Sequence, residues 1–330
     1  MRREETTRDN EPVRPIVVLS RCLDLEPVRY DGQVIPYEFV RELEPWVQYR
    51  PVCPELEIGL GVPRDPVRIV TVEGVARLVQ ADTGRDFTGE IRGFSDDFLS
   101  DLGPVDGFLL KNRSPSCGIS DVKIHHGPDP SASSKRGAGF FAKRVLELHP
   151  GLAIEDEGRL RNYRVREHFL TKLFSLAKLS AVEGSGQMKE IVRFHSINKL
   201  LLMAYNQKEM RALGRVVATT QKLGFEEVAR AYRDRFQAAL ARPPRYTSVI
   251  NVFEHASGYF SKQLESREKK LFRSTLDRYR NKRVPMAAVT AMLRAWIVRF
   301  EEDYLMAQTF FEPYPMELMS LGDSGKWRAV

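Results

Sequence analysis

The chain has 330 residues, of which 42% are hydrophobic and 29% are charged, so it can bury sizeable cores and remain soluble. This length favours two domains, and no run of about 18 apolar residues predicts a transmembrane helix. The net charge of +7 is unevenly divided, because residues 1–160 carry −6 and residues 161–330 carry +13. A strongly basic half attracts polyanions, nucleic acid above all. A solvated helical surface can carry the same excess of Lys and Arg.

The N-terminus is polar and lacks the apolar core of a signal peptide. We therefore expect residues 1–14 to form a disordered arm and the protein to be cytoplasmic. Three cysteines in a chain of this length argue against a disulfide framework.

Residues 15–150 alternate strand-like and helix-like segments, which predicts an α/β domain with a parallel, Rossmann-like sheet. The expected strands are 15–20, 67–70, 107–110 and 122–124, and the expected helices are 88–101 and 140–148. The Gly/Pro/Ser-rich stretch 127–139, with Gly137 and Gly139 at its end, is expected to be mobile.

From residue 161 onward strand patterns disappear, and the pattern predicts an all-α helical bundle. A first helix is expected at 165–179, followed by a linker at 181–186. Ile197, Leu200, Leu201 and Ala204 form one helical stripe, and residues 289–300 form another that begins near Pro285. We place the first domain at residues 15–172 and the second at residues 185–330.

The three cysteines all follow strands or lie in loops. Cys22 follows the first strand, Cys53 lies in Val52-Cys53-Pro54-Glu55, and Cys117 ends the loop that begins at Lys111 after the strand 107–110. Their separations fit no local metal-binding motif, so the fold would have to assemble a shared site. Three thiolates could hold zinc, or a 4Fe-4S cluster with one open iron, or they could be three unrelated buried cysteines.

Four motifs occur in order: Ser20-Arg21-Cys22-Leu23, Arg29-Tyr30-Asp31-Gly32, Cys53-Pro54-Glu55 followed by Gly59-Leu60 and Pro63-Arg64, and the loop Lys111 to Gly118. As a set they resemble the thiouracil desulfurase (TudS) family over roughly residues 14–170. The segment from Phe194 to Tyr205, followed by Leu213 to Ala218, resembles the YbgA-type domain. The fused arrangement resembles the RudS type of desulfidase, which removes sulfur from 4-thiouridine in tRNA.

The resemblance implies a 4Fe-4S cluster held by Cys22, Cys53 and Cys117, with an open iron that captures the thiocarbonyl sulfur in a non-redox reaction. A further cysteine that is frequent in the family is replaced here by Val28, and we take that cysteine to be non-ligating. Glu55 would activate water or shuttle protons, and Ser114 would bond the substrate or relay a proton.

Three further residues are candidates for substrate binding. Lys111 would neutralise negative charge, Arg64 would bind phosphate, and Ser20 would shape the first cysteine loop. Each role has a structural alternative: Lys111 could be a solvated strand end and Arg64 could brace the loop by a salt bridge. Likewise, Glu55 could cap a helix and Ser114 could stabilise a turn.

In the second domain, His195 and Lys199 stand four apart and are candidates for RNA contact, although a packing histidine beside an exposed lysine is an equal alternative. Lys269, Lys270 and Arg273 belong to a charged run that could form a basic ridge for tRNA. No aromatic RNA-recognition motif occurs, so phosphate contacts would dominate.

The leading hypothesis is an iron-sulfur desulfidase acting on thiolated tRNA, converting 4-thiouridine to uridine. The first alternative is the same chemistry on free 2-thiouracil or related thiobases. The second is a non-enzymatic iron-sulfur or zinc protein that binds nucleic acid.

Overall fold

The structure is a computed structural model that describes residues 13–127, 133–218 and 223–319. Its described residues divide into two compact units, an N-terminal unit that ends at Ala177 and also contains residues 317–319, and a helical unit from Lys178 to Met316. The arm expected at residues 1–14 lies outside the described residues up to residue 12. Arg14, which is described, donates from Nη2 to the carbonyl oxygen of Val47 at 2.9 Å.

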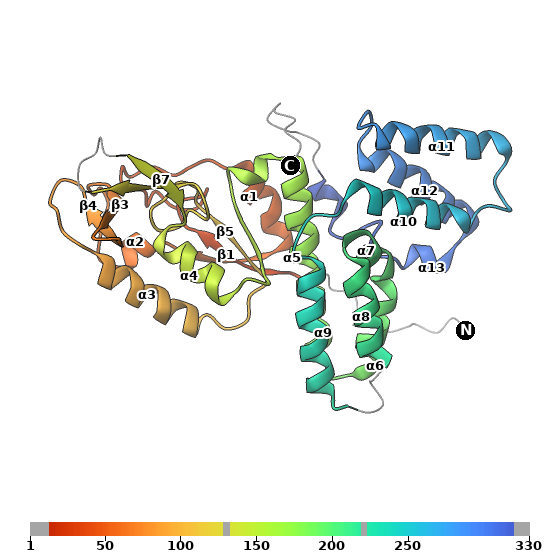
Figure 1. Ribbon diagram of the computed structural model, residues 1–330, viewed down its shortest axis with the longest axis horizontal. Coiled ribbons are helices and arrows are strands. Elements are labelled where there is room, and N and C mark those ends of the chain that lie inside the picture. Colours follow the sequence, from red (N-terminus) through yellow and green to blue (C-terminus); the bar gives the residue numbers. More distant parts are fainter. Residues whose placement is uncertain (1–12, 128–132, 219–222, 320–330) are drawn as a thin grey trace, which may run out of the picture. The chain divides into compact units, whose positions relative to one another are not determined.

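The N-terminal unit contains eight strands among its described residues, and short helices connect them (Figure 1). The strands are β1 (Ile16–Ser20), β2 (Gln48–Val52), β3 (Val67–Val72), β4 (Val75–Gln80), β5 (Gly107–Leu110), β6 (Val122–His126), β7 (Ser134–Gly137) and β8 (Ala153–Asp156). The helices are α1 (Glu38–Leu43), η1 (Glu44–Trp46), α2 (Pro54–Glu57), α3 (Thr88–Asp101), α4 (Phe140–Leu148), η2 (Arg159–Arg161) and the first part of α5 (Tyr163–Gly184), with η3 (Met316–Leu318) closing the described chain.

The first sheet has the order β2-β1-β5-β8, and all its strand pairs are parallel. Its central strands β1 and β5 are almost fully buried, which explains why both read as continuous apolar runs. Gly107 at the start of β5 allows close packing, because a Cβ there would lie 2.6 Å from the Ala153 carbonyl oxygen. The predicted parallel α/β domain is confirmed in this sheet.

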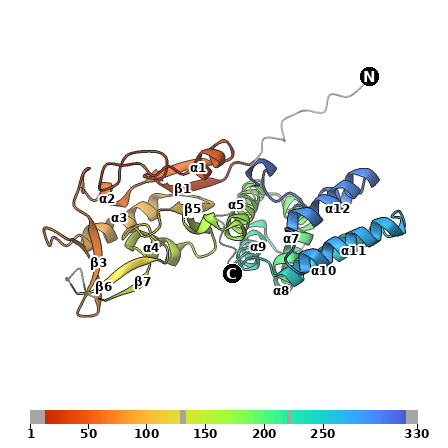
Figure 2. The ribbon, with the colours of Figure 1, turned by 90° about the horizontal axis from the view of Figure 1, so that it is seen from above.

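A second sheet, with the order β4-β3-β6-β7, was not expected. Its β3–β4 and β6–β7 pairs are antiparallel, and only β3–β6 is parallel. Ile69, Leu78 and Val122 of this sheet pack with Phe87 and Ile91, at and beyond the start of α3. The stretch 127–139, expected to be mobile, contains β7, while residues 128–132 lie outside the described part. α3 and α4 lie side by side (Figure 2), where Phe98 meets Phe141 at 5.7 Å between ring centroids.

The helical unit contains only helices and connecting turns among its described residues, which confirms the predicted all-α region. After the end of α5 come α6 (Met188–Ile197), α7 (Lys199–Tyr205), α8 (Gln207–Ala218), α9 (Phe225–Ala239), α10 (Tyr246–Gly258), α11 (Ser266–Arg280), α12 (Met286–Phe300) and α13 (Asp303–Met306). Leu201, Phe253 and Leu293 belong to one continuous apolar core that joins α7, α10 and α12.

Two expectations for the helical region differ from the structure. The expected linker at 181–186 is helical up to Gly184, because α5 continues and Glu183 pairs with Arg233 of α9. The stripe from Ile197 to Ala204 is split between α6 and α7 at Asn198. The buried Asn198 side chain donates to the Phe194 carbonyl oxygen at 2.8 Å and accepts from Thr309 Oγ1 at 2.7 Å.

None of the described helices has both the length and the apolar character that a membrane crossing requires.

Candidate active site

The three cysteines lie beyond the carboxyl ends of three adjacent strands. Cys22 follows β1, Cys53 directly follows β2, and Cys117 ends the loop that follows β5. Because β1 is hydrogen-bonded to both β2 and β5, the parallel register brings these strand ends to the same edge. Open α/β sheets place their chemistry at this edge. All three cysteines are free thiols.

The three thiols lie near enough to affect one another's pKa values. Burial, and then the neighbouring Cys53 thiol, raise the pKa of Cys22 to about 12, while Lys111 acts in the opposite direction. Burial raises the pKa of Cys117 well above its usual value, a hydrogen bond from Ser20 lowers it, and Cys22 and Cys53 raise it further. Burial also raises the pKa of Cys53. The fold therefore brings together three cysteines whose spacing in the sequence did not settle whether they are neighbours.

The loop that carries Cys117 is held by Ser114. Its Oγ accepts from the backbone N–H groups of Ser116 and Cys117, at 3.2 and 3.1 Å. Its carbonyl oxygen accepts from the Gly118 N–H at 2.9 Å. Ser114 thus stabilises the turn, which was the structural role considered for it. Its hydroxyl also lies 3.4 Å from Glu55 Oε1.

The N-terminal end of α4 is hydrogen-bonded to the same loop. The N–H groups of Gly139 and Phe140 donate to the carbonyl oxygens of Gly118 and Pro115, at 2.8 and 3.0 Å. Ala142 N–H donates to the carbonyl oxygen of Ser116 at 3.0 Å. A Cβ on Gly139 would lie 2.6 Å from this loop backbone, so Gly139 permits a close approach. From the sequence, simple flexibility was favoured for Gly139 over a phosphate cradle.

Glu55 reaches the loop from the other side. Its Oε1 accepts from Ser116 Oγ at 3.1 Å and from Ser114 Oγ at 3.4 Å. Its Oε2 pairs with the Arg64 Nη2 at 2.6 Å. The carboxylate is therefore fixed between a guanidinium and two hydroxyls, beside the thiols whose pKa values it raises.

Two other expected binding residues are engaged within the chain. The Lys111 ammonium pairs with Glu157 Oε1 at 2.5 Å and donates to the carbonyl oxygen of Asn112 at 2.9 Å. Ser20 Oγ accepts from the Lys111 N–H at 2.9 Å. Lys111 thus acts on the site through its charge, and Ser20 joins the ends of β1 and β5.

The candidates for RNA contact lie on three helices of the helical unit. His195 is near the end of α6, and its Nδ1 lies 3.3 Å from the Tyr232 hydroxyl. Lys199 begins α7, so the break at Asn198 separates the two residues that one helical face was expected to hold. Lys269, Lys270 and Arg273 lie on α11, with Lys270 and Arg273 exposed.

The three cysteines form a donor set of the kind that an iron-sulfur cluster requires. A tetrahedral zinc site requires ligand atoms at about 2.0–2.3 Å from one ion. No group of three His, Cys, Asp or Glu side chains in the described part of the chain is arranged to hold one metal ion. Three free thiols, of which Cys53 and Cys117 are buried and Cys22 is partly exposed, interact electrostatically, and such a set fits the thiolate ligation of an iron-sulfur cluster.

Residues 17–157 match the family described as 2-thiouracil desulfurase, and this match spans the strands and loops that carry all three cysteines. The uncharacterized protein YbbK of Bacillus subtilis (strain 168) is 30% identical over 155 residues, which are 44% of this chain and 99% of YbbK. The chain belongs to the 2-thiouracil desulfurase family. In this family member, residues 199–315 match a second family, described as a protein of unknown function (DUF1722), so the expected fusion is confirmed.

Two further relatives complete the comparison of this desulfurase family member. The uncharacterized protein YbgA of Escherichia coli (strain K12) is 27% identical over 164 residues, which are 49% of this chain and 96% of YbgA. A solved structure described as [4Fe-4S]-dependent thiouracil desulfidase TudS is 28% identical, with a TM-score of 0.36, and covers 44% of this chain and 93% of its own.

Sequence reasoning missed two residues of this site. Ser116 is fully buried, and its hydroxyl donates to Glu55. It belongs to the Ser-Pro-Ser-Cys motif, and that motif could have pointed to it. Glu157 follows β8 and pairs with Lys111. The strand-end argument that selected the cysteines would have found Glu157, had the segment 153–156 been recognised as a strand.

Proposed function

We propose that this chain is a desulfidase that removes the thiocarbonyl sulfur from a thiolated uracil in tRNA, converting 4-thiouridine to uridine. The overall reaction is hydrolytic: the carbon–sulfur bond breaks, a carbon–oxygen bond to water forms, and sulfide leaves. No electrons are gained or lost. The observation that carries the proposal is the meeting of three thiols with the Glu55 carboxylate at one edge of the parallel sheet.

The proposed cofactor is a 4Fe-4S cluster held by Cys22, Cys53 and Cys117, which leaves one iron without a protein ligand. Such an iron would act as a Lewis acid and accept the sulfur of the substrate. Burial raises the pKa of Cys22 and of Cys53, and the positive charges of Lys111, and of Arg21 and Arg64 near Cys53, oppose part of this rise in the direction of the thiolate forms that ligation requires.

Glu55 is the proposed base. Its carboxylate takes a proton from water as the water oxygen adds to the ring carbon, and returns the proton to the departing sulfur. Arg64 holds Oε2 at 2.6 Å and leaves Oε1 toward the two serine hydroxyls, so the carboxylate has one fixed and one working oxygen. Ser114 is proposed to relay the proton, because its hydroxyl reaches both Glu55 and the Cys117 loop.

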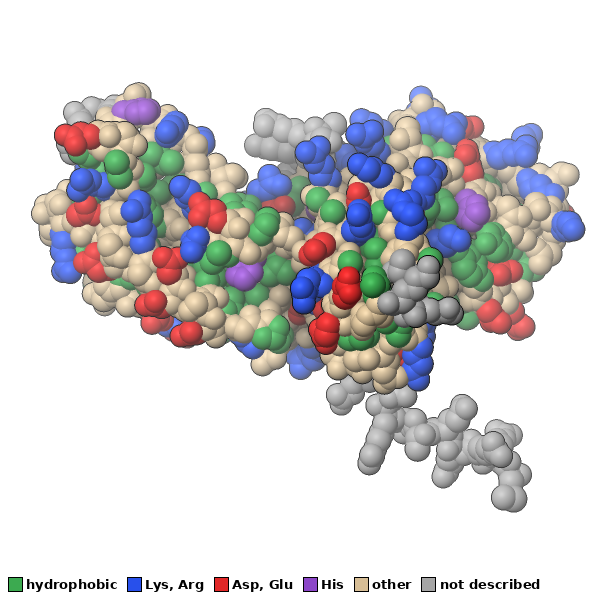
Figure 3. All heavy atoms as spheres, turned by 60° about the horizontal axis from the view of Figure 1, so that its bottom comes forward, with side chains coloured by type: hydrophobic (Ala, Val, Ile, Leu, Met, Phe, Trp, Pro, Cys, Tyr) green, Lys and Arg blue, Asp and Glu red, His purple; other side chains and the backbone are tan. Residues whose placement is uncertain are grey.

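The choice of tRNA is supported by charge. Most of the +13 of residues 161–330 lies in the helical unit, because residues 178–316 carry 24 Lys and Arg against 14 Asp and Glu, a net charge of +10. Figure 3 shows Lys and Arg side chains gathered on the visible face of this helical unit. No ion pair within the described residues involves Lys270 or Arg273 of α11, so both are available for phosphate.

A free thiobase is the second candidate substrate. The description of the family itself, 2-thiouracil desulfurase, favours it. The two candidates differ in one measurable property, because only tRNA requires the basic helical unit.

The test is turnover by protein that is purified without oxygen and reconstituted with iron and sulfide. It is given tRNA that contains 4-thiouridine, or free 2-thiouracil, while loss of thiocarbonyl absorbance and release of sulfide are followed. We expect turnover of tRNA by the native chain and none by Cys117→Ala. Glu55→Gln should lose roughly a hundredfold or more in rate yet keep the cluster spectrum, whereas the exposed Glu90→Gln on α3 serves as a matched control.

Substrate choice is tested by charge reversal. Lys270→Glu with Arg273→Glu should weaken tRNA binding and reduce its dependence on salt. The control pair is Lys123→Glu with Lys135→Glu, which changes the charge equally on exposed positions of the N-terminal unit. Turnover of 2-thiouracil but not of tRNA would reject the tRNA proposal. A cluster spectrum with no turnover of either substrate would reject the desulfidase proposal.

A further inference from the structure

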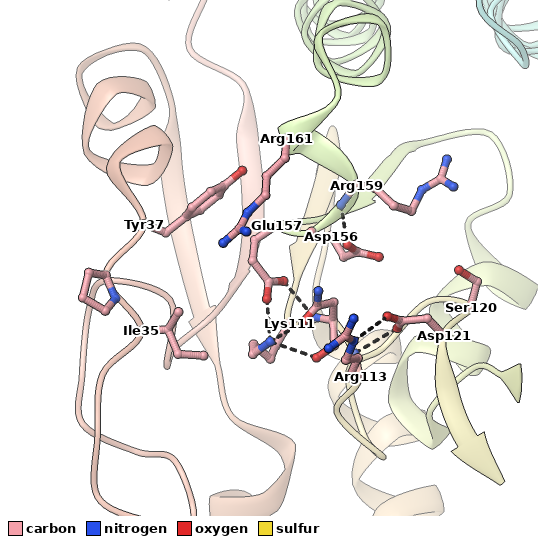
Figure 4. Close-up of a pocket in the computed structure, with 13 residues that line it drawn as sticks. Ile35, Tyr37, Lys111, Arg113, Ser120, Asp121, Asp156, Glu157, Arg159 and Arg161 are labelled. Carbon is pink, nitrogen blue, oxygen red and sulfur yellow. Dashed lines mark hydrogen bonds and ion pairs between the residues drawn. The ribbon is translucent and has the colours of Figure 1, made fainter. Parts of the chain in front are cut away.

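A hollow lies in the N-terminal unit between the second sheet and the helices α3 and α4, which lie next to this sheet in Figure 2. Its lining residues come mainly from β3, β4, β6 and β7 on one side and from α3 and α4 on the other. Its volume of about 590 Å³ is within the usual range for small-ligand sites. We call it the sheet–helix hollow. Among the described residues it shares none with the hollow at the ends of β5 and β8, which Lys111, Glu157 and Arg161 line (Figure 4).

The floor of the sheet–helix hollow is apolar. Ile69, Ala76 and Ile124 line it from β3, β4 and β6, and Phe140 lines it from the start of α4. Ile69 is buried in the core of this sheet, whereas Ala76, Ile124 and Phe140 are only partly buried. An apolar surface that is left partly open to water favours a ligand with an apolar body.

The charged residues of the hollow leave an excess of positive charge. Four cations and two carboxylates line it: Arg92, Lys135, Lys143, Arg144, Asp96 and Glu147. Arg144 pairs with both carboxylates, because its Nε lies 2.6 Å from Asp96 Oδ1 and its Nη1 lies 3.5 Å from Glu147 Oε2. Both acidic groups are therefore engaged by one guanidinium, and the remaining charge of the hollow favours an anion.

Arg92 and Lys135 are the cations that a ligand can reach. Both are exposed, and neither forms an ion pair with a carboxylate in the described part of the chain. The Arg92 guanidinium lies 5.6 Å from the centroid of the Phe140 ring. A guanidinium beside an aromatic ring can bind a flat anion by charge-assisted hydrogen bonds and by stacking.

Helix α4 connects the sheet–helix hollow to the loop that carries Cys117. Phe140 lines the hollow, and its backbone N–H donates to the Pro115 carbonyl oxygen at 3.0 Å. Ala142, in the same helical turn, donates to the Ser116 carbonyl oxygen at 3.0 Å. A ligand that contacts this turn only in its docked position stabilises that position by mass action.

We propose that the sheet–helix hollow is a second ligand site, separate from the cysteine site. It binds a small organic anion with a flat apolar body, and Arg92 contacts the anionic group. The bound ligand rests on the apolar floor and holds α4 against the Cys117 loop.

The first measurement is binding of naphthoate, a flat organic anion, to the full chain by titration calorimetry. Naphthamide lacks its charge and acetate lacks its apolar body, so we expect naphthoate to bind most tightly of the three. Arg92→Gln should weaken naphthoate binding by roughly tenfold. Ala76→Phe should weaken it as well, because the larger side chain fills the floor. The matched controls are Lys123→Gln and Val75→Phe, at exposed positions of β6 and β4 outside the hollow, and both should bind as the native chain does.

The second measurement is amide hydrogen exchange in the native chain. The N–H groups of Gly139, Phe140 and Ala142 all donate to the Cys117 loop, so their exchange reports the opening of this contact. Naphthoate at about ten times its dissociation constant should slow this exchange by about tenfold. The same concentration should have a much smaller effect on Arg92→Gln.

Each outcome decides one part of the proposal. Equal affinity of the native chain and Arg92→Gln for naphthoate, or equal affinity of the native chain for naphthoate and naphthamide, overturns the anion site. Acetate binding as tight as that of naphthoate rejects the apolar floor as part of the site. Binding that depends on Arg92 without slower exchange supports the site and rejects its hold on the loop. Neither measurement involves turnover, so a failure of the proposed reaction is distinguishable from a failure of this site.

Discussion

Arg64 and Glu55 form a nearly buried ion pair beside the three cysteines. The Arg64 Nη2 and Nε atoms lie 2.6 and 3.1 Å from Glu55 Oε2, and the two side chains are 6% and 13% exposed. Arg64 Nη1 also donates to the carbonyl oxygens of Val28 and Gly61. Because every nitrogen of the guanidinium is engaged, this geometry favours the role of a brace over that of a phosphate contact.

The first prediction concerns this brace. Arg64→Gln should lower the free energy of unfolding by about 3 kcal/mol, because it leaves the Glu55 carboxylate without its charged partner. It should also slow desulfuration while leaving the affinity for substrate nearly unchanged, since Arg64 positions Glu55. Urea denaturation and steady-state kinetics measure the two effects.

Arg77→Gln is the matched control for this brace. Arg77 pairs with Asp86 at 3.1 Å, but both side chains are more than one-third exposed. Its removal should change stability by less than about 1 kcal/mol. Equal losses in the two variants would show that the Arg64 pair has no special role.

The second prediction separates two serines that share Glu55. Ser114→Ala removes the acceptor of two loop N–H groups, including that of Cys117, so it should weaken cluster retention and slow turnover. Ser116→Ala removes only a donor to Glu55, so it should slow turnover by about tenfold with a normal cluster spectrum. Iron content and visible absorbance are compared with turnover for each variant. Identical iron loss in both variants would contradict the assignment.

The third prediction concerns the contact between α4 and the cysteine loop. Gly139→Ala places a Cβ 2.6 Å from the backbone of Pro115 and Ser116, so we expect a loss of about 2 kcal/mol in stability and a lower cluster content. Gly93→Ala on α3 is the control, because a Cβ there meets nothing within 4 Å. That change should stabilise the protein by about 0.5–1 kcal/mol. Thermal melting of both variants decides the point.

The fourth prediction is a pH dependence of stability at Asp156. Burial raises the pKa of Asp156 to about 6. The hydrogen bond from the Arg159 N–H lowers this pKa, and the negative charges of Glu157 and its neighbours raise it. Because the folded state then binds this proton more tightly than the unfolded state, the stabilisation is complete below about pH 4. It is lost as the pH rises through about 6.

Asp156→Asn removes this titration. The variant should therefore be more stable than the native chain at pH 8, by about 1–2 kcal/mol, with the difference shrinking toward pH 4. Urea denaturation at pH 4, 6 and 8 measures this difference. A difference that does not vary with pH would assign the effect to packing.

Much of the N-terminal fold was predictable because its periodicities are local. The strand 107–110 and the helices 88–101 and 140–148 agree with the structure to the residue. The second sheet was not predictable, because β7 is polar and largely exposed and only one residue of β4, Leu78, is buried, so neither strand has the apolar pattern of a buried strand. The break at Asn198 depends on Thr309, a partner more than 100 residues away.

The candidate site shows the same division. The cysteines, Glu55 and Ser114 lie in motifs that stand out in the sequence, and the fold brings them together. The partners that decide how they work do not stand out. Arg64 is committed to Glu55, Lys111 is committed to Glu157, and Gly139 faces the loop only because α4 docks there. Such pairings depend on which strand ends are neighbours in the sheet, and the strand order cannot be read from the sequence pattern.

The continuity of α5 matters for anyone who wishes to divide this protein. The boundary between the two compact units falls between Ala177 and Lys178, inside a helix that runs without interruption from Tyr163 to Gly184. A fragment that starts after the helix loses Glu183, the partner of Arg233, and Lys178, whose ammonium donates to the Pro313 carbonyl oxygen at 3.2 Å. A fragment for expressing the helical part alone should therefore begin before Lys178, so that it keeps both of these interactions.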